Sequence, residues 1–335
     1  MPRRQSRDLA ANARSTIRLD PDANRHPQTS HRRRLCLERF TAWLCLHLDE
    51  SISFDKLSVP ELSTALIGFG KHLFYEGEPK YVFAETINAL VDLMPHLRGQ
   101  LAAPWSTLAR WEEAEPQNRS MIMPASVFQA AVALSLLWGW HRFAAALLIG
   151  FHGLLRPNEF LHLQRVDLVL PRDVLSPERI AYIRIWHSKT SRFMLRQHAR
   201  ISDEITVSFL DRLFGAEDKS SLLFGCSPSI FRNRWDKVFK HLGICTIEKK
   251  QGITPKSLRG SGASWFFHRT EDLDRVMWRG RWQAKRTLEF YLQDVMGQVL
   301  LKNLSIHHQS LVRELAEASS FLLEESLTTS VHATR

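Results

Sequence analysis

The sequence of 335 residues has few cysteines, and none of them has the spacing of a zinc site or a redox pair. Its four cysteines (Cys36, Cys45, Cys226 and Cys245) include no CxxC pair, so we expect reduced thiols inside a cell. The sequence also lacks a P-loop and a GxGxxG run. These absences argue against a zinc-binding module, a P-loop NTPase and a dinucleotide-binding enzyme.

Long uninterrupted hydrophobic runs are also missing. The most apolar stretch, 127–155, is broken by Gln129, His141 and Arg142, so a buried pair of core helices explains it better than a membrane span. The first ten residues, MPRRQSRDLA, contain no apolar segment, and we expect no secretory signal there. We therefore predict an intracellular protein with no membrane partner.

Basic residues outnumber acidic ones, and they are concentrated in two regions. The formal net charge is +10. Residues 1–40 hold ten Arg against four acidic residues, residues 181–300 hold 21 basic against 12 acidic residues, and residues 41–180 are slightly acidic. A basic arm and a basic second half suit a polyanion such as DNA, because phosphate neutralisation dominates affinity for DNA. Basic proteins are common, however, and charge alone does not identify a partner.

Hydrophobic spacing divides the chain into two folded parts. Residues 1–30 are polar and Arg-rich, and we expect a disordered basic arm. The Arg32–Arg34 cluster fits a localisation signal, a DNA-contacting arm or a solvated helix start. Apolar residues at three- and four-residue steps predict a helical domain over 31–114, and the polar, proline-bracketed segment 115–124 predicts a linker.

The second part, 125–300, is predicted to be mostly helical with a small sheet. Two apolar helices lead to Arg156, and Pro157 suits the first turn of a third helix. Residues 181–187 alternate as a strand and 194–202 form its return strand, which places Lys189 near a hairpin tip. The fold class is therefore mainly α with a small β-sheet (α+β). The amphipathic tail, 301–335, packs on its own chain or on a neighbouring subunit.

Basic and aromatic residues follow a fixed order through the second part. The ordered set is Arg156, Lys189, Lys256, Arg259, Trp282 and Tyr291. Guanidinium groups bind the oxygens of a phosphodiester bidentately, and a phenol oxygen can attack its phosphorus. Because the chain has only four tyrosines, Tyr291 is a specific candidate for the nucleophile.

This ordered set resembles the motifs of the tyrosine recombinase (phage integrase) family. Residues 153–159 read G-L-L-R-P-N-E against a G-L-R-x-x-E pattern. A β-hairpin lysine follows, as at Lys189, and residues 256–259 read K-S-L-R against H-x-L-R. Trp282 lies nine residues before Tyr291, at the family's spacing for a His or Trp before the nucleophile. The lysine at 256 departs from the family's histidine.

The resemblance implies a helical core-binding domain followed by a catalytic domain, in an enzyme that cuts and rejoins double-stranded DNA. Tyr291 would form a 3′-phosphotyrosyl intermediate, with no metal or cofactor. Arg156 and Arg259 would hold the phosphate, Glu159 would orient Arg156, and Lys189 would be the general acid. The resemblance further implies a homo-tetramer on two paired DNA sites, a mobile-element origin and, in a eukaryote, a nuclear location.

Each of these residues also has a structural interpretation. Arg156 fits a salt bridge to Glu159 or Asp167, and Arg259 fits a structural arginine. In the functional interpretation, the small residues 260–263 that follow Arg259 let the backbone approach DNA. Lys189 fits plain solvent exposure, whereas Trp282 and Tyr291 fit core aromatics.

The function itself has two alternatives. A recombinase-derived protein that has lost catalysis and binds DNA is favoured weakly by Lys256. A type IB topoisomerase-like enzyme, which relaxes DNA, would share the same pocket chemistry.

Overall fold

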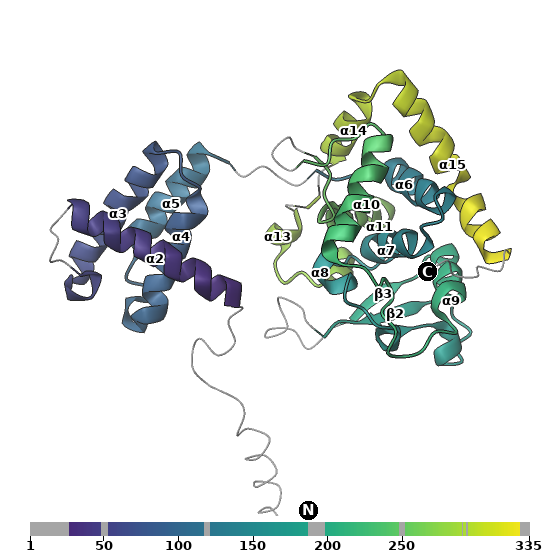
Figure 1. Ribbon diagram of the computed structural model, residues 1–335, viewed down its shortest axis with the longest axis horizontal. Coiled ribbons are helices and arrows are strands. Elements are labelled where there is room, and N and C mark those ends of the chain that lie inside the picture. The colour runs from purple at the N-terminus through teal and green to yellow at the C-terminus, as the bar shows by residue number, and fades with distance from the viewer. Residues whose placement is uncertain are drawn as a thin grey trace, which may run out of the picture. The chain divides into compact units, whose positions relative to one another are not determined.

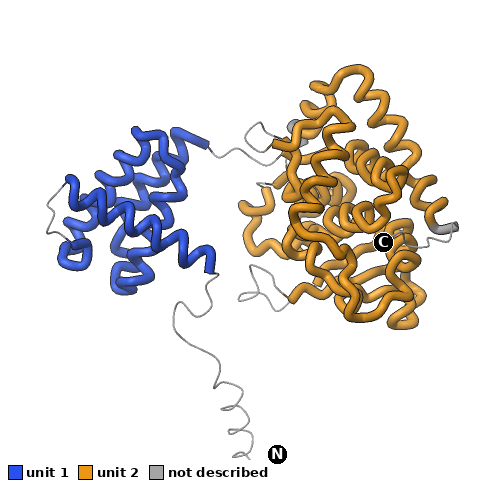
Figure 2. The backbone as a smooth tube through the Cα atoms, in the orientation of Figure 1, with its two compact units in different colours: residues 1–117 blue, residues 118–335 orange. Residues whose placement is uncertain are grey.

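A computed structural model describes residues 27–47, 53–116, 121–186, 198–247, 252–289, 291–292 and 294–328. The chain forms two compact units, Met1–Gln117 and Asn118–Arg335 (Figure 2). The division falls inside the segment 115–124, between a helix that ends at Ala114 and one that begins at Ala125. Each unit has its own hydrophobic core.

Over 27–47 and 53–116, unit 1 is a bundle of four α-helices with two short 3₁₀ turns, Phe54–Lys56 and Pro95–Leu97. Its core is made by residues at helical spacing, among them Phe40, Leu66 and Phe83, which are fully buried. The helices are α2 (Pro27–His47), α3 (Val59–Tyr75), α4 (Lys80–Leu93) and α5 (Ala102–Ala114). Helix α2 begins at Pro27, so residues 27–30 are helical although they were expected to belong to a disordered arm; the rest of that expected arm lies outside the described residues.

The arginine cluster at 32–34 is part of this folded bundle. Arg33 forms ion pairs with Glu85 and Asp92 of α4, and Arg32 lies 2.7 Å from Glu85. These ion pairs connect α2 to α4, and they hold two of the three arginines against the bundle. Arg32 and Arg34 are exposed near the start of α2, as a solvated helix start requires, whereas Arg33 is partly buried by its ion pairs and departs from that interpretation.

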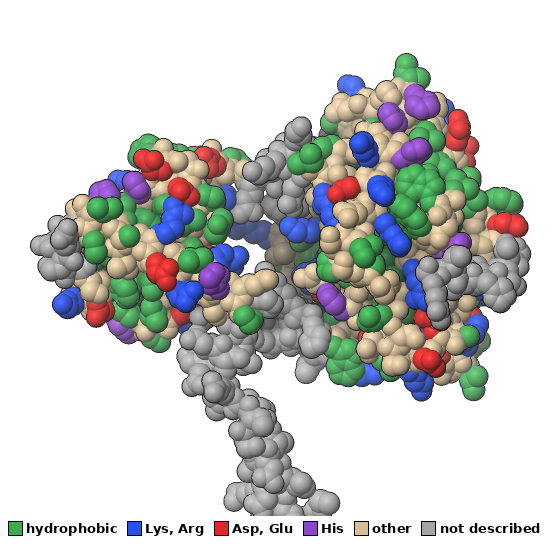
Figure 3. All heavy atoms as spheres, in the orientation of Figure 1, with side chains coloured by type: hydrophobic (Ala, Val, Ile, Leu, Met, Phe, Trp, Pro, Cys, Tyr) green, Lys and Arg blue, Asp and Glu red, His purple; other side chains and the backbone are tan. Residues whose placement is uncertain are grey.

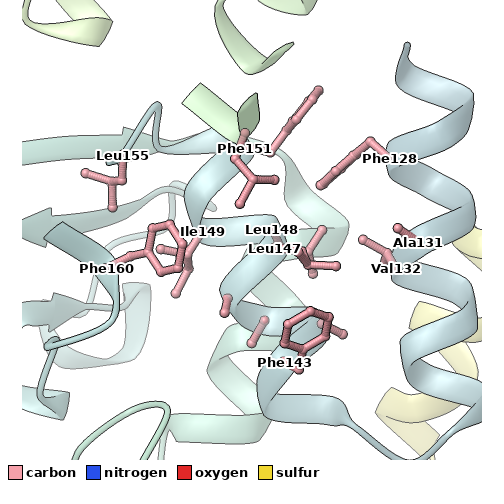
Figure 4. Close-up of a cluster of buried hydrophobic side chains, with 14 of the residues drawn as sticks. Phe128, Ala131, Val132, Phe143, Leu147, Leu148, Ile149, Phe151, Leu155 and Phe160 are labelled. Carbon is pink, nitrogen blue, oxygen red and sulfur yellow. The ribbon is translucent and has the colours of Figure 1, made fainter. Parts of the chain in front are cut away.

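Unit 2 is built around two almost wholly apolar helices, α6 (Ala125–Leu137) and α7 (His141–His152). Phe128 of α6 stacks on Phe151 of α7 with ring centroids 3.8 Å apart, and both lie in the buried cluster of Figure 4. Because the faces of both helices are apolar almost all round, they are buried by other elements. The surrounding helices are α8 (Pro157–Phe160), α9 (Glu204–Phe214), α10 (Pro228–His241), α11 (Ser257–Thr270), α12 (Leu273–Gly280), α13 (Lys285–Glu289), α14 (Asp294–Lys302) and α15 (Ile306–Thr328).

The described part of unit 2 also contains a small antiparallel sheet of three strands. Its order is β1 (Leu168–Val169), β2 (Ala181–Arg184) and β3 (His198–Ile201), with Tyr182 opposite Arg200. The mainly α fold with a small sheet is therefore confirmed. Strand β1 was not predicted, because two residues are too few to show alternation. The predicted hairpin tip, including Lys189, lies outside the described residues.

The C-terminal helix α15 packs on its own chain. It runs beside α6 and also contacts α9 (Figure 1). Val312 and Leu323 of α15 are buried in the core of unit 2. Of the two placements predicted for the tail, the helix takes the one within its own chain.

No described helix has the length and hydrophobicity that crossing a membrane requires. Within the same residues, no group of three His, Cys, Asp or Glu side chains could hold a metal ion.

Candidate active site

The first arginine of the predicted set lies in a tight turn between α7 and α8. Helix α7 ends at His152, and Leu154 then adopts a left-handed backbone with φ of 51°. Leu155 is fully buried, which fixes the turn against the core. Arg156 precedes Pro157 at the start of α8, where a proline loses no hydrogen bond. This turn leaves the Arg156 side chain 32% exposed.

The carboxylate of Glu159 is the centre of the site. Its Oε1 accepts a hydrogen bond from the Arg156 guanidinium at 2.8 Å, and its Oε2 accepts one from the Arg156 backbone N–H at 2.9 Å. Arg281 donates to Oε2 at 2.9 Å, and Arg259 lies 3.6 Å from the same oxygen. Burial opposes ionisation of Glu159, but these cations and the backbone donor hold its pKa below the ordinary value. Glu159 is therefore a buried anion that orients Arg156.

Arg259 enters the same cluster from helix α11. Its side chain is only 2% exposed, and it donates to the carbonyl oxygens of Leu154 at 2.9 Å and Gly280 at 2.5 Å. The guanidinium also lies over the Trp282 ring, 4.3 Å from its centroid. Burial and the nearby charges of Arg156 and Arg281 lower the pKa of Arg259 to about 9. It is therefore still a cation at neutral pH, although its charge is costly to bury.

Trp282 and Tyr291 form the aromatic side of the site. Their ring centroids are 5.4 Å apart and the rings are inclined by 56°. Trp282 is buried, whereas Tyr291 is half-buried. The Tyr291 backbone carbonyl accepts a hydrogen bond from Ser264 of α11 at 3.1 Å. The tyrosine is thus attached to the helix that carries Arg259.

The two predicted lysines are placed differently. Lys256 lies at the N-terminal end of α11, one helical turn before Arg259, and its side chain is exposed. Residues three apart lie on one face of a helix, so Lys256 is on the side of α11 that carries Arg259. Lys189 lies outside the described residues.

The small residues at 260–263 pack inside the protein, and the approach of their backbone to DNA stays a prediction. All four are buried. A Cβ added to Gly262 would lie 2.1 Å from the carbonyl oxygen of Phe151, so α11 crosses α7 in close contact there. A Cβ added to Gly260 would lie 3.2 Å from Cδ1 of Tyr291. These glycines therefore bring Arg259 and Tyr291 close to the turn that holds Arg156.

Arg281 is the site residue that the sequence reasoning missed. It lies in the sequence directly before Trp282, and its side chain is 4% exposed. Its backbone is left-handed, with φ of 60°. No motif indicated it, because only the fold brings it to Glu159, 122 positions away. A glycine-like conformation at a non-glycine residue is not visible in a sequence.

The site combines an excess of buried positive charge with a phenol. Among the described residues, three guanidinium groups (Arg156, Arg259 and Arg281) face one carboxylate (Glu159), so these four side chains together carry +2. The fold brings together Arg156, Glu159, Arg259, Trp282 and Tyr291. The salt bridge of Arg156 to Glu159 was predicted as its structural alternative, and it is present. Such a cluster can bind an anion whose negative charge increases during reaction.

Basic side chains also lie on the surface of unit 2. Helix α10 carries Arg232, Arg234, Lys237 and Lys240 against a single acidic residue, Asp236. Lys237 and Lys240 are exposed. Figure 3 shows Lys and Arg side chains gathered over the region of α10. This surface is suited to a polyanion.

No family model matches the sequence, and no curated protein matches it either. Among solved structures, the Tn1549 transposon integrase, in complex with transposon right end DNA, is similar with a TM-score of 0.53. It shares 11% sequence identity over 89% of this chain and 98% of that chain. XerH site-specific recombinase bound to difH substrate has a TM-score of 0.48 at 14% identity, covering 88% of this chain and 83% of that one. XerA recombinase has a TM-score of 0.41 at 15% identity, covering 83% and 93%. At this identity the first of these similarities shows the fold alone: this chain has the fold of that transposon integrase.

Proposed function

We propose that this protein is a site-specific recombinase that cuts and rejoins double-stranded DNA through a covalent link to Tyr291. The observation that carries the proposal is the assembly of Arg156 and Arg259 around Glu159, with the Trp282 ring between Arg259 and Tyr291 in contact with both. The tyrosine recombinase fold supports the same function, as does the DNA in the structure of the similar transposon integrase.

Arg156 and Arg259 would bind the non-bridging oxygens of the scissile phosphate. Arg156 is the exposed end of the cluster, and its other donors remain accessible while one holds Glu159. The Nε of Arg259 has no hydrogen-bond partner among the described residues. A bound anion would be one partner for such an unsatisfied buried donor. The two charges would stabilise the extra negative charge of the pentacoordinate transition state.

Tyr291 would be the nucleophile. Its phenol would lose its proton to solvent as its oxygen bonds to the phosphorus, the bond from phosphorus to the 5′-oxygen would break, and the released 5′-oxygen would take up a proton. Trp282 packs against the Tyr291 ring and would fix its direction of attack. A 5′-hydroxyl from a partner strand would reverse the step. The bond energy stays in the phosphotyrosyl link, so this chemistry proceeds without a metal or cofactor.

One lysine would bind the phosphate by its charge, and the other would protonate the leaving group. Lys256 lies beside Arg259 on α11 and would hold the phosphate as a point charge. Lys189 would protonate the leaving 5′-oxygen. Two duplexes must be cut for strand exchange, so the active form would be a tetramer on paired sites.

A suicide substrate tests the function. A mixed pool of nicked duplexes, or duplexes with 5′-bridging phosphorothiolates, releases the 5′ end and traps the covalent intermediate. We expect an adduct with the wild type and none with Tyr291→Phe, which keeps the ring against Trp282 and removes only the nucleophilic oxygen. Salt-sensitive DNA binding with no adduct in either protein, on a pool that contains the bound sequence, would instead favour a protein that only binds DNA.

The exposed lysine at position 256 favours keeping this binding-only alternative, since the family has a histidine there. Substitution of Lys256 by His separates the two functions. A recombinase should form adducts at least as fast with Lys256→His as with the wild type. A topoisomerase-like enzyme would be recognised by relaxation of supercoiled DNA with no strand exchange between duplexes.

A further inference from the structure

Arg281 has a position in the site that its sequence neighbours do not explain. It ends helix α12 in the left-handed region (φ 60°, ψ 42°), where a glycine would be unstrained. A non-glycine residue in this conformation persists only when surrounding contacts hold it. Those contacts are made by its side chain, which is buried and donates to Glu159 at 2.9 Å.

Arg259 also contacts the two residues that flank Arg281. The Gly280 carbonyl accepts from Arg259 at 2.5 Å, and the next residue after Arg281 is Trp282, over whose ring Arg259 lies. Arg281 also lies 3.5 Å from the Leu154 carbonyl to which Arg259 donates. Arg281 therefore joins the Trp282 turn to the segment that carries Arg156 and Glu159.

Besides joining the two segments, Arg281 adds positive charge to the site. A single Glu159 carboxylate beside only Arg156 and Arg259 would cancel half of their charge. Arg281 adds a third cation within hydrogen-bond distance of that carboxylate. Opposite charges a few ångströms apart interact strongly where burial excludes water, so this pairing changes how much positive charge remains for a phosphate.

We propose that Arg281 is a positioning residue of the phosphate site: it supplies the counter-charge of Glu159, so that Arg156 and Arg259 keep their charge for the bound phosphate, and it fixes the Trp282 turn. This rests on the proposed function only in that the cluster binds a phosphate. It does not depend on whether Tyr291 cuts DNA.

The variant Arg281→Gly isolates the side chain, because glycine favours the left-handed backbone already present. The probe is inorganic phosphate at constant ionic strength and neutral pH, with affinity measured from the rise in Tm with phosphate concentration. We expect Arg281→Gly to bind phosphate at least ~10-fold more weakly than the wild type, equivalent to ~1.4 kcal/mol. Arg281→Lys, which keeps the charge, should recover most of the affinity.

The double variant Glu159→Gln/Arg281→Gly tests the route through Glu159. With the carboxylate neutral, no counter-charge is needed, and the double variant should bind phosphate within about threefold of the wild type, a change below ~1 kcal/mol. A defect that persists unchanged in the double variant would refute the route through Glu159. Equal phosphate affinity in wild type and Arg281→Gly would refute the proposal as a whole. If phosphate did not raise the Tm of the wild type, the cluster would not bind phosphate and the proposal for Arg281 would be refuted. The adduct assay tests the role of Tyr291 independently of this result.

Discussion

Substitution of Gly260 by Ala should separate stability from activity. Gly260 lies inside helix α11, directly after Arg259, and its missing side chain makes room for the Tyr291 ring. An added Cβ would lie 3.2 Å from Cδ1 of Tyr291 and 3.5 Å from Cγ2 of Ile122. The contact with Ile122 is ordinary, whereas the contact with Tyr291 requires the ring to move by a few tenths of an ångström.

The two effects of this substitution have opposite signs. Replacing a glycine by alanine in a helix interior raises the free energy of unfolding by up to ~1 kcal/mol. A misplacement of 1 Å costs roughly 100-fold in rate, so a few tenths of an ångström should slow attack by Tyr291 by about 3- to 10-fold. We therefore expect Gly260→Ala to be as stable as the wild type or more stable, yet slower to form the covalent adduct.

Urea unfolding and single-turnover adduct formation measure the two effects. The matched control is Gly297→Ala in helix α14, where an added Cβ would lie 3.4 Å from Pro124. The control should gain similar stability with an unchanged rate. If Gly260→Ala formed the adduct at the wild-type rate, the close approach of α11 to Tyr291 would not position the nucleophile, and the reasoning would be wrong.

Two further predictions concern the charges of the site. Arg259→Lys should slow adduct formation by ~100-fold or more, and lower the free energy of unfolding by ~1–3 kcal/mol. The reason is that one ammonium group cannot replace a planar guanidinium that donates to both Leu154 and Gly280. Adduct kinetics and urea unfolding check both values, and a wild-type rate would contradict the assigned contact with phosphate. The pKa of the Glu159 carboxyl is lower in the folded protein than in the unfolded chain, so its ionised form stabilises the fold. This contribution to the free energy of unfolding is fully present above the unfolded-state pKa of ~4.3, and it is lost as the pH falls through the folded-state pKa. The difference in unfolding free energy between the wild type and Glu159→Gln, measured in urea from pH 7 to pH 3, should therefore shrink below about pH 4; a difference that stays constant with pH would show that Glu159 is not a buried anion.

The elements with strong periodicity could be predicted from the sequence. Helices α3 and α4 show apolar residues at helical steps, and α6 and α7 are apolar over their whole length. The start of α2 was missed because its first turns are polar and their ion pairs to Glu85 and Asp92 come from a distant helix. Strand β1 is a two-residue strand that exists only through its pairing with β2.

The candidate site was predictable only where it follows a local motif. The position of Arg156 after an apolar helix, and the nine-residue spacing of Trp282 and Tyr291, are local in the sequence. Arg281 and Gly260 could not be found this way. Their roles depend on long-range contacts, with Glu159 in one case and with the Tyr291 ring in the other.

The most direct test of the central claim is to identify the residue that carries the DNA. The wild-type protein would be trapped on a nicked suicide duplex, digested with protease and nuclease, and the nucleotide-bearing peptide sequenced by mass spectrometry. We expect a nucleotide joined through its 3′-phosphate to Tyr291, with a free 5′-hydroxyl on the released strand. A nucleotide on any other residue, or a 5′-phosphate link to Tyr291, would contradict it.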